Sequence, residues 1–83
     1  MKLADIEDAL DDLLIAHYPD GCNPDYQIHF DIGERGFYFE SMYPWNPLVG
    51  WDLYEVGPST MLGEVRSIHE LQVLLISLMK VET

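Results

Sequence analysis

Two segments near the ends of the chain repeat apolar residues at the spacing of an amphipathic helix, about 100° per residue. Residues 3–18 place one set of side chains on a common arc: Leu3, Ile6, Leu10, Leu13, Leu14 and His17. Residues 68–80 do the same with Ile68, Leu71, Leu74, Leu75, Leu78 and Met79. Pro19-Asp20-Gly21 predicts the end of the first helix. Ser67 and Glu70 have the spacing of a capping box, which predicts where the second helix begins.

The middle of the chain alternates apolar and polar residues with the period of two that is typical of half-buried strands. Residues 26–32 alternate throughout, and residues 37–43 and 49–56 follow the same pattern. Glycines on both sides of the turn between the first two strands predict a hairpin. Residues 59–66 have no clear period, so they form either a lid over the core or a further short strand.

These elements predict one compact α+β domain over residues 1–83. The order α-β-β-β-α packs most simply as a two-layer sandwich, an antiparallel three-stranded meander with both helices on one face. The other face of the sheet is then open to solvent. Its expected side chains are Gln27, His29, Asp31, Tyr38, Glu40, Met42, Asp52 and Tyr54.

The charge of the chain points to a class of partner. There are 15 Asp and Glu residues against 4 Lys and Arg residues, a formal net charge of -11 in 83 residues. The first predicted helix carries a cluster of acids, with one apolar residue on the same arc: Asp5, Glu7, Asp8, Asp11, Asp12 and Ile15. Such a surface repels phosphates, so we expect no direct binding of nucleic acid, and it suits a basic protein. The alternative is a solvated face that keeps a small protein soluble.

No motif in the sequence indicates an enzyme, a metal site or a cofactor. There is no nucleophile elbow, P-loop or glycine-rich dinucleotide turn. The three histidines and the cysteine do not share a ligand spacing such as CxxC or HxxxH; they are His17, His29, His69 and Cys22. We therefore expect a non-enzymatic protein without a cofactor or bound metal.

The sequence also favours the cytoplasm. Cys22 is the single cysteine, which is typical of a reducing compartment. The longest apolar run, residues 73–76, is far too short to span a bilayer. Acidic residues follow Met1 almost at once, unlike the start of a secretory signal. We expect a cytoplasmic protein with no membrane partner.

The segment Tyr43–Leu48 is the best candidate for a binding anchor outside the acidic surface. Pro44 and Pro47 stiffen it, and Trp45 is of the residue type that dominates interface energetics. The alternative is that the Trp45 ring folds back and caps the sheet edge. The predicted partner-binding residues are then Asp5, Asp8, Asp11, Asp12, Ile15, Glu40, Trp45, Asp52 and Tyr54.

The last predicted helix bears on self-association. Val73 and Ile76 lie off its main apolar arc, so they are available to a second copy of the chain. Repulsion between two chains of the same charge opposes that contact, and salt screens the repulsion. We expect a monomer or a weak homodimer that salt favours.

In size, α+β order, single cysteine and the cluster Asp5-Glu7-Asp8-Asp11-Asp12, the chain resembles the small acidic proteins that phages and mobile elements use against host defences, the anti-CRISPR and DNA-mimic inhibitors. The resemblance is one of character, without a shared motif, and no site residues carry over from it. It implies an inhibitor in the host cytoplasm that occupies the basic nucleic-acid groove of an effector complex, with carboxylates where phosphates would lie. The alternative is an immunity or regulatory subunit that caps a basic toxin or enzyme.

Overall fold

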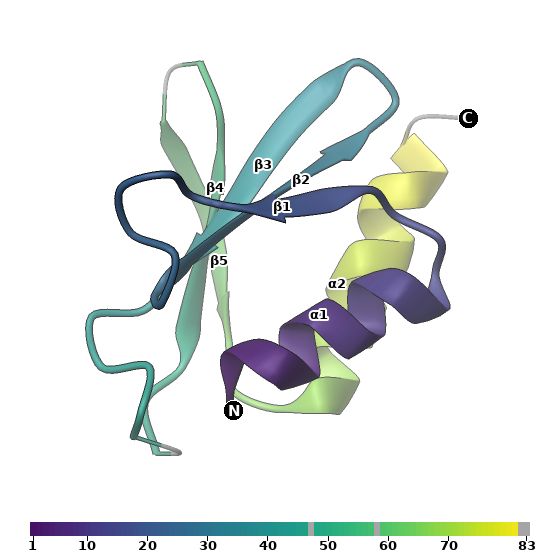
Figure 1. Cartoon of the computed structure of the whole chain (residues 1–83). Helices are drawn as coiled ribbons and strands as arrows, with labels where there is room; N and C mark the ends of the chain where they lie inside the picture. The colour runs from purple at the N-terminus through teal and green to yellow at the C-terminus, as the bar shows by residue number, and fades with distance from the viewer. Residues whose placement is uncertain (47, 58, 82–83) are drawn as a thin grey trace.

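A five-stranded antiparallel sheet with two helices makes up the computed structural model, which describes residues 1–46, 48–57 and 59–81 (Figure 1). The elements are α1 (Leu3–Asp12), β1 (His17–Pro19), β2 (Gln27–Ile32), β3 (Arg35–Glu40), β4 (Trp51–Glu55), β5 (Thr60–Val65) and α2 (Ile68–Val81). The strands lie side by side in chain order, each antiparallel to the next. The α+β class is confirmed, whereas the expected three-stranded meander has too few strands.

The first helix ends six residues earlier than the apolar pattern predicts. Its last turn closes as a Schellman motif: the N–H of Ile15 donates to the Leu10 carbonyl at 2.9 Å, and that of Leu14 donates to the Asp11 carbonyl at 3.0 Å. Leu14 takes the left-handed position of this motif with φ of 59°. Glycine usually occupies that position, so the sequence lacks the signal by which such a helix end is recognised.

The chain that leaves α1 forms a strand that the sequence did not indicate. β1 pairs with β2, with His17 opposite Phe30 and Tyr18 opposite His29. The predicted helix over residues 13–18 is therefore wrong. His17 belongs to an edge strand instead, where its ring Nε2 lies 2.7 Å from a carboxylate oxygen of Asp11.

The ambiguous segment 59–66 is the fifth strand rather than a lid. β5 pairs with β4 from Thr60 to Val65, with a shift of register between Leu53 and Tyr54 that leaves Leu62 as the extra residue of a bulge. Strands β3 and β4 are shorter than predicted. Consequently Met42, expected on the open face of the sheet, lies in the loop after β3 and is 70% exposed.

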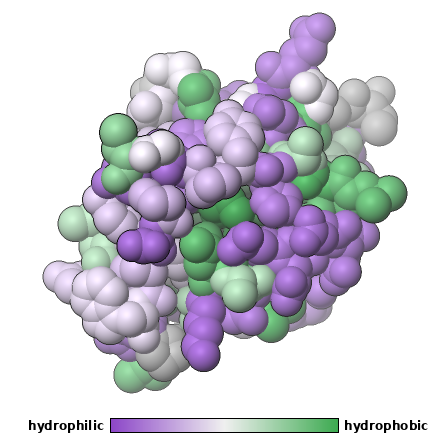
Figure 2. All heavy atoms as spheres, in the orientation of Figure 1, coloured by the Kyte–Doolittle hydropathy of each residue, from purple (hydrophilic) through white to green (hydrophobic). Residues whose placement is uncertain are grey.

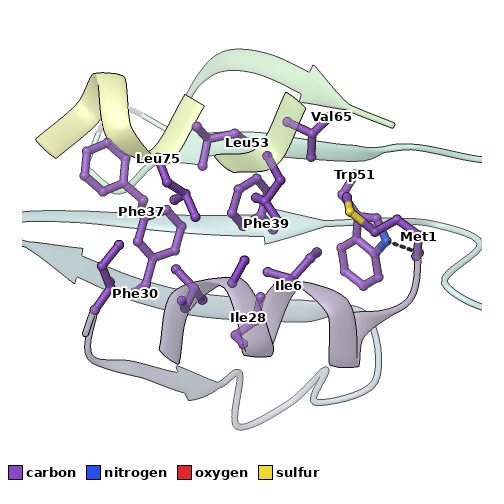
Figure 3. Packing of buried hydrophobic residues seen from close by; sticks show 14 of the residues in the cluster. Met1, Ile6, Ile28, Phe30, Phe37, Phe39, Trp51, Leu53, Val65 and Leu75 are labelled. Carbon is purple, nitrogen blue, oxygen red and sulfur yellow. Dashed lines mark hydrogen bonds between the residues drawn. The ribbon is translucent and has the colours of Figure 1, made fainter. Parts of the chain in front are cut away.

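The core lies between the sheet and the helices. The inward residues of β2, β3 and β4 meet α1 and α2 there: Ile28, Phe30, Phe37, Phe39, Trp51, Leu53, Ile6, Leu10, Leu71 and Leu75 (Figure 3). Phe30 stacks between two rings of β3, those of Phe37 and Phe39, with centroids 5.3 Å apart in each pair. Every second residue of each central strand points into this layer, so the residues between them on the same strand point to the solvent side of the sheet.

The start of α2 follows the predicted capping box in part. The Ser67 hydroxyl accepts a hydrogen bond from the Glu70 N–H at 3.1 Å. The Glu70 carboxylate accepts one in return from the N–H of Arg66, one residue before the expected donor. Both bonds satisfy backbone donors around the first turn of the helix.

We expect Leu14→Gly to raise stability. Leu14 is 93% exposed, so truncating it loses little packing, while a leucine with φ of 59° carries a steric cost of about 1–2 kcal/mol. Part of that gain is offset by the greater freedom of glycine in the unfolded chain, leaving about 0.5–1 kcal/mol. Urea unfolding followed by circular dichroism measures the difference. Leu14→Ala removes the same side chain but keeps the strain, so it should give no gain; an equal gain in both variants would contradict the explanation.

Candidate partner-binding site on the open face of the sheet

A row of stacked rings crosses the open face from β1 to β4. The ring of Tyr18 stacks on His29 with centroids 5.4 Å apart, and His29 lies 5.2 Å from Tyr38. Tyr38 in turn stacks on Tyr54 at 5.0 Å. The row follows from the register, because each of these residues is directly opposite the next across its strand pair. Met61 of β5 is opposite Tyr54 and extends the row to the sheet edge.

A second row, mostly carboxylates, runs beside the rings. Glu40 is opposite Asp52, and Asp52 is opposite Glu64, so three acids lie on three adjacent strands. On β2 the row begins with Gln27, whose side-chain amide donates to Glu40 at 3.0 Å. Like charges directly opposite each other in a sheet repel. The row therefore concentrates negative charge beside an aromatic surface.

The pKa values of two groups at this place are raised, by burial first and by the neighbouring acids second. Burial raises the pKa of the Asp52 carboxyl above its ordinary value, and the charges of Glu64 and Glu40 raise it further. The pKa of the Tyr54 hydroxyl is raised by burial first, and then by the nearby charges of Asp52 and Glu40. Both raised pKa values show that negative charge is unfavourable at this place. A cation over the row would relieve the repulsion, whereas a phosphate would increase it.

We expect Asp52→Asn to stabilise the protein at neutral pH. The folded state raises the pKa of Asp52, so the ionised carboxylate destabilises the fold, and removing its charge should add up to about 1 kcal/mol. The gain should shrink as pH falls through the raised pKa, because the wild-type carboxyl then takes up a proton. Thermal unfolding from pH 4 to pH 8 measures this. Asp31→Asn is the matched control: Asp31 is exposed on the same face but lies opposite Gly36 rather than an acid. Equal gains in both variants would show that only overall charge matters.

His29 is held in the ring row by the loop between β1 and β2. Its Nε2 lies 3.0 Å from a carboxylate oxygen of Asp20, and both side chains are mostly buried. The other Asp20 oxygen accepts hydrogen bonds from the N–H groups of Asn23 and Cys22. These backbone bonds, Asn23 first, lower the pKa of Asp20, and the His29 ring lowers it further. Asp20 thus ties the loop to the centre of the open face.

The loop between β3 and β4 carries an exposed apolar cluster next to the carboxylate row. It joins the strands at Glu40 and Trp51, and Figure 1 shows it on the side of the sheet away from the helices. Four large side chains are more than half exposed, which are Met42, Tyr43, Trp45 and Leu48. The Trp45 ring, 75% exposed, meets Tyr43 edge to face at 5.8 Å and does not fold back onto the sheet edge. Pro47 lies outside the described residues.

The acids of α1 form a separate surface. Figure 2 shows hydrophilic side chains over this helix, where Asp8, Asp11 and Asp12 are exposed. Asp11 is paired with His17. Asp5 accepts a hydrogen bond from the Lys2 N–H at 2.9 Å and so caps the helix. Because α1 packs against the inner face of the sheet, its acids lie away from the open face.

The placement of Ile15 on the acidic arc is wrong. The side chain is 7% exposed and belongs to the core. The helix stops before Ile15, and the Schellman turn directs this residue inward to accompany Leu10. Ile15 is therefore not available to a partner.

The predicted site residues thus fall into three groups. Glu40, Asp52 and Tyr54 lie together on the open face, with Trp45 in the adjoining loop. The α1 acids lie elsewhere, and Ile15 is buried. Sequence reasoning missed Tyr18 and Glu64, which complete the two rows. Alternation in β5 could have indicated Glu64, but the bulge at Leu62 breaks the period; nothing local indicated Tyr18.

In residues 1–46, 48–57 and 59–81, no group of three or more His, Cys, Asp or Glu side chains is placed to hold a metal ion. No helix in this part of the chain has the length and apolar character needed to cross a membrane.

Compared with protein-family models, curated proteins and solved structures, the chain gives no match in any of the three.

Proposed function

We propose that this protein is a non-enzymatic, acidic binding protein that inhibits a basic, nucleic-acid-binding partner, in the manner of an anti-CRISPR or DNA-mimic inhibitor. The observation that carries the proposal is the carboxylate row of Glu40, Asp52 and Glu64 beside a row of stacked aromatic rings. Carboxylates attract lysine and arginine side chains, and aromatic faces bind the same cations.

The surface also suits inhibition rather than catalysis. The two rows run across adjacent strands of the sheet, and the carboxylate row lies at the strand ends from which the exposed loop with Trp45 departs. A basic groove that normally holds phosphates would find carboxylates in their place, with Trp45 as an apolar anchor beside them. A second acidic surface on α1, centred on Asp8 and Asp12, adds to the field that steers a basic partner.

The test begins with the partner. Immobilised protein is exposed to a lysate of its host at low salt, and bound proteins are released with an excess of duplex DNA. We expect release of a basic protein whose own binding to nucleic acid is lost when this chain is added back. A captured partner that is acidic, or one that binds nucleic acid equally well in the complex, would contradict the proposal.

Neutralising variants then locate the contact. Glu40→Gln, Asp52→Asn and Glu64→Gln together remove the charge of the open face while conserving shape. Asp8→Asn and Asp12→Asn do the same on α1. We expect the first set to weaken binding at every salt concentration, and the second mainly to slow association at low salt. Unchanged affinity in the first set would remove the open face from the interface.

The nature of the captured protein separates the two forms of the proposal. An effector of host defence supports an inhibitor of the anti-CRISPR or DNA-mimic kind. A toxin or enzyme encoded beside this chain supports an immunity or regulatory subunit instead. Both forms need the same acidic surface.

A further inference from the structure

The two edge strands of the sheet differ in how well they are protected against pairing with a further strand. β1 is a short edge strand that ends in Pro19, which has no N–H to offer a neighbouring strand. β5 is the opposite edge and is twice as long, at six residues. β4 pairs with one side of β5, and no strand of the described residues pairs with the other.

A groove of about 540 Å³ lies between β5 and α2. Gly63 is opposite the buried Leu53, so it occupies an inward position without a side chain to fill the space toward the helix. A Cβ atom at Gly63 would meet no atom within 4 Å. The lining is Gly63, Glu64, Val65, His69, Glu70, Val73, Leu74 and Ser77. On α2, the lining residue Val73 is 51% exposed, and Ile76, on the same helix but outside the lining, is 42% exposed.

The residues that line the groove come from a segment of the chain whose formal net charge is zero. Residues 56–81 contain two acids, Glu64 and Glu70, and two bases, Arg66 and Lys80, for a net charge of zero. Residues 1–55 contain twelve acids and two bases, for a net charge of -10. Arg66 lies beside both acids of the neutral part: its side chain pairs with Glu64, and its N–H donates to Glu70.

We propose that a second copy of this chain covers the β5/α2 groove in a two-fold dimer, with the apolar side chains along α2 of each copy packed against the groove of the other. Glu64 and Glu70 line the groove and Arg66 lies beside both, so this part of the surface carries less net charge than the acidic surfaces to which a basic partner is drawn. Two copies of a chain with a net charge of -11 approach with least repulsion through the part of the chain that has the smallest net charge. The open face, on the other side of the sheet from α2, stays free in each copy.

The dimer does not rest on the proposed function, although Glu64 belongs both to the carboxylate row and to the lining of the groove. A dimer presents two open faces on one particle. A partner with two basic grooves could then bind both open faces of the dimer, which increases avidity without any new kind of contact.

Sedimentation equilibrium of the intact chain tests the dimer across concentration and salt. We expect association with a dissociation constant below about 100 µM in 0.5 M NaCl, weakening at low salt as repulsion between the acidic parts grows. A chain that stays monomeric at about 1 mM in high salt would overturn the proposal.

Charged substitutions at Val73 locate the contact. Val73→Glu and Val73→Lys each place a charge in the proposed interface, and we expect each to raise the dissociation constant by about tenfold or more. The two variants change the net charge in opposite directions, so overall repulsion cannot explain a loss in both. Leu48→Glu, at an 84% exposed position in the loop between β3 and β4, is the matched control. It should change the dissociation constant less than about threefold. A dimer that survives both Val73 changes would exclude this groove.

Discussion

Trp51→Ala is expected to cost about 3–5 kcal/mol of folding free energy, a large part of what the protein has. A domain of 83 residues has a stability of about 4–12 kcal/mol. Trp51 is fully buried in β4 between the sheet and the helices, and its indole N–H donates to the Met1 carbonyl at 2.8 Å (Figure 3). Truncation leaves a cavity and removes the partner of a buried carbonyl.

Two further variants separate the causes. Trp51→Phe keeps a ring in the core but loses the N–H donor, so we expect a smaller cost of about 1–3 kcal/mol. Trp45→Ala removes the same type of side chain from a 75% exposed position and should cost less than about 0.5 kcal/mol. Urea unfolding monitored by circular dichroism gives all three values. If Trp51→Ala unfolds at nearly the same urea concentration as the wild type, the core is not organised around this residue.

The central strands could be predicted because one side of each is buried. In β2, Ile28, Phe30 and Ile32 point into the core while the residues between them face solvent. A strand with one buried face leaves a strict alternation in the sequence, and that alternation fixes which face each residue occupies. For the same reason Glu40, Asp52 and Tyr54 were correctly placed together on the open face.

The edges of the sheet could not be predicted in the same way. Leu13, Leu14 and His17 continue the helical spacing past Asp12, so the period gives no sign that α1 has ended. The helix ends because Ile15 is buried through a Schellman turn, which is a tertiary effect. At the other edge, β5 has exposed apolar residues and a bulge, and neither gives a clear period.

The candidate site depends on register, which is why only part of it was visible in the sequence. Each ring of the row from Tyr18 to Tyr54 comes from a different strand. Their contact is decided by the register of three strand pairs, and residue spacing along the chain does not contain that information. A surface assembled across strands is accordingly harder to predict than one on a single helix, such as the acids of α1.

Trp45→Ala is expected to weaken partner binding by about 2 kcal/mol or more, which is a loss of about thirtyfold in affinity. The ring is 75% exposed in the free protein and contacts Tyr43 at its edge, so most of its surface is available to a partner. The adjoining carboxylates of Glu40 and Asp52 would set the orientation of a basic partner, while the indole supplies apolar area at low entropic cost. Because the effect comes from buried apolar area, it should persist in high salt, unlike the effect of neutralising Asp8 and Asp12 on α1.

Leu48→Ala is the matched control for this prediction. Leu48 is 84% exposed in the same loop, but it lacks the large aromatic surface typical of interface anchors, so we expect a loss of less than about threefold. Calorimetric titration of the isolated partner with each variant, at low and high salt, measures the affinities, and thermal unfolding measures the stabilities. A marked fall in melting temperature for Trp45→Ala without a specific loss of affinity would assign the ring a structural role. Equal losses for Trp45→Ala and Leu48→Ala would mean that the loop contributes general apolar contact and that the indole is not its anchor.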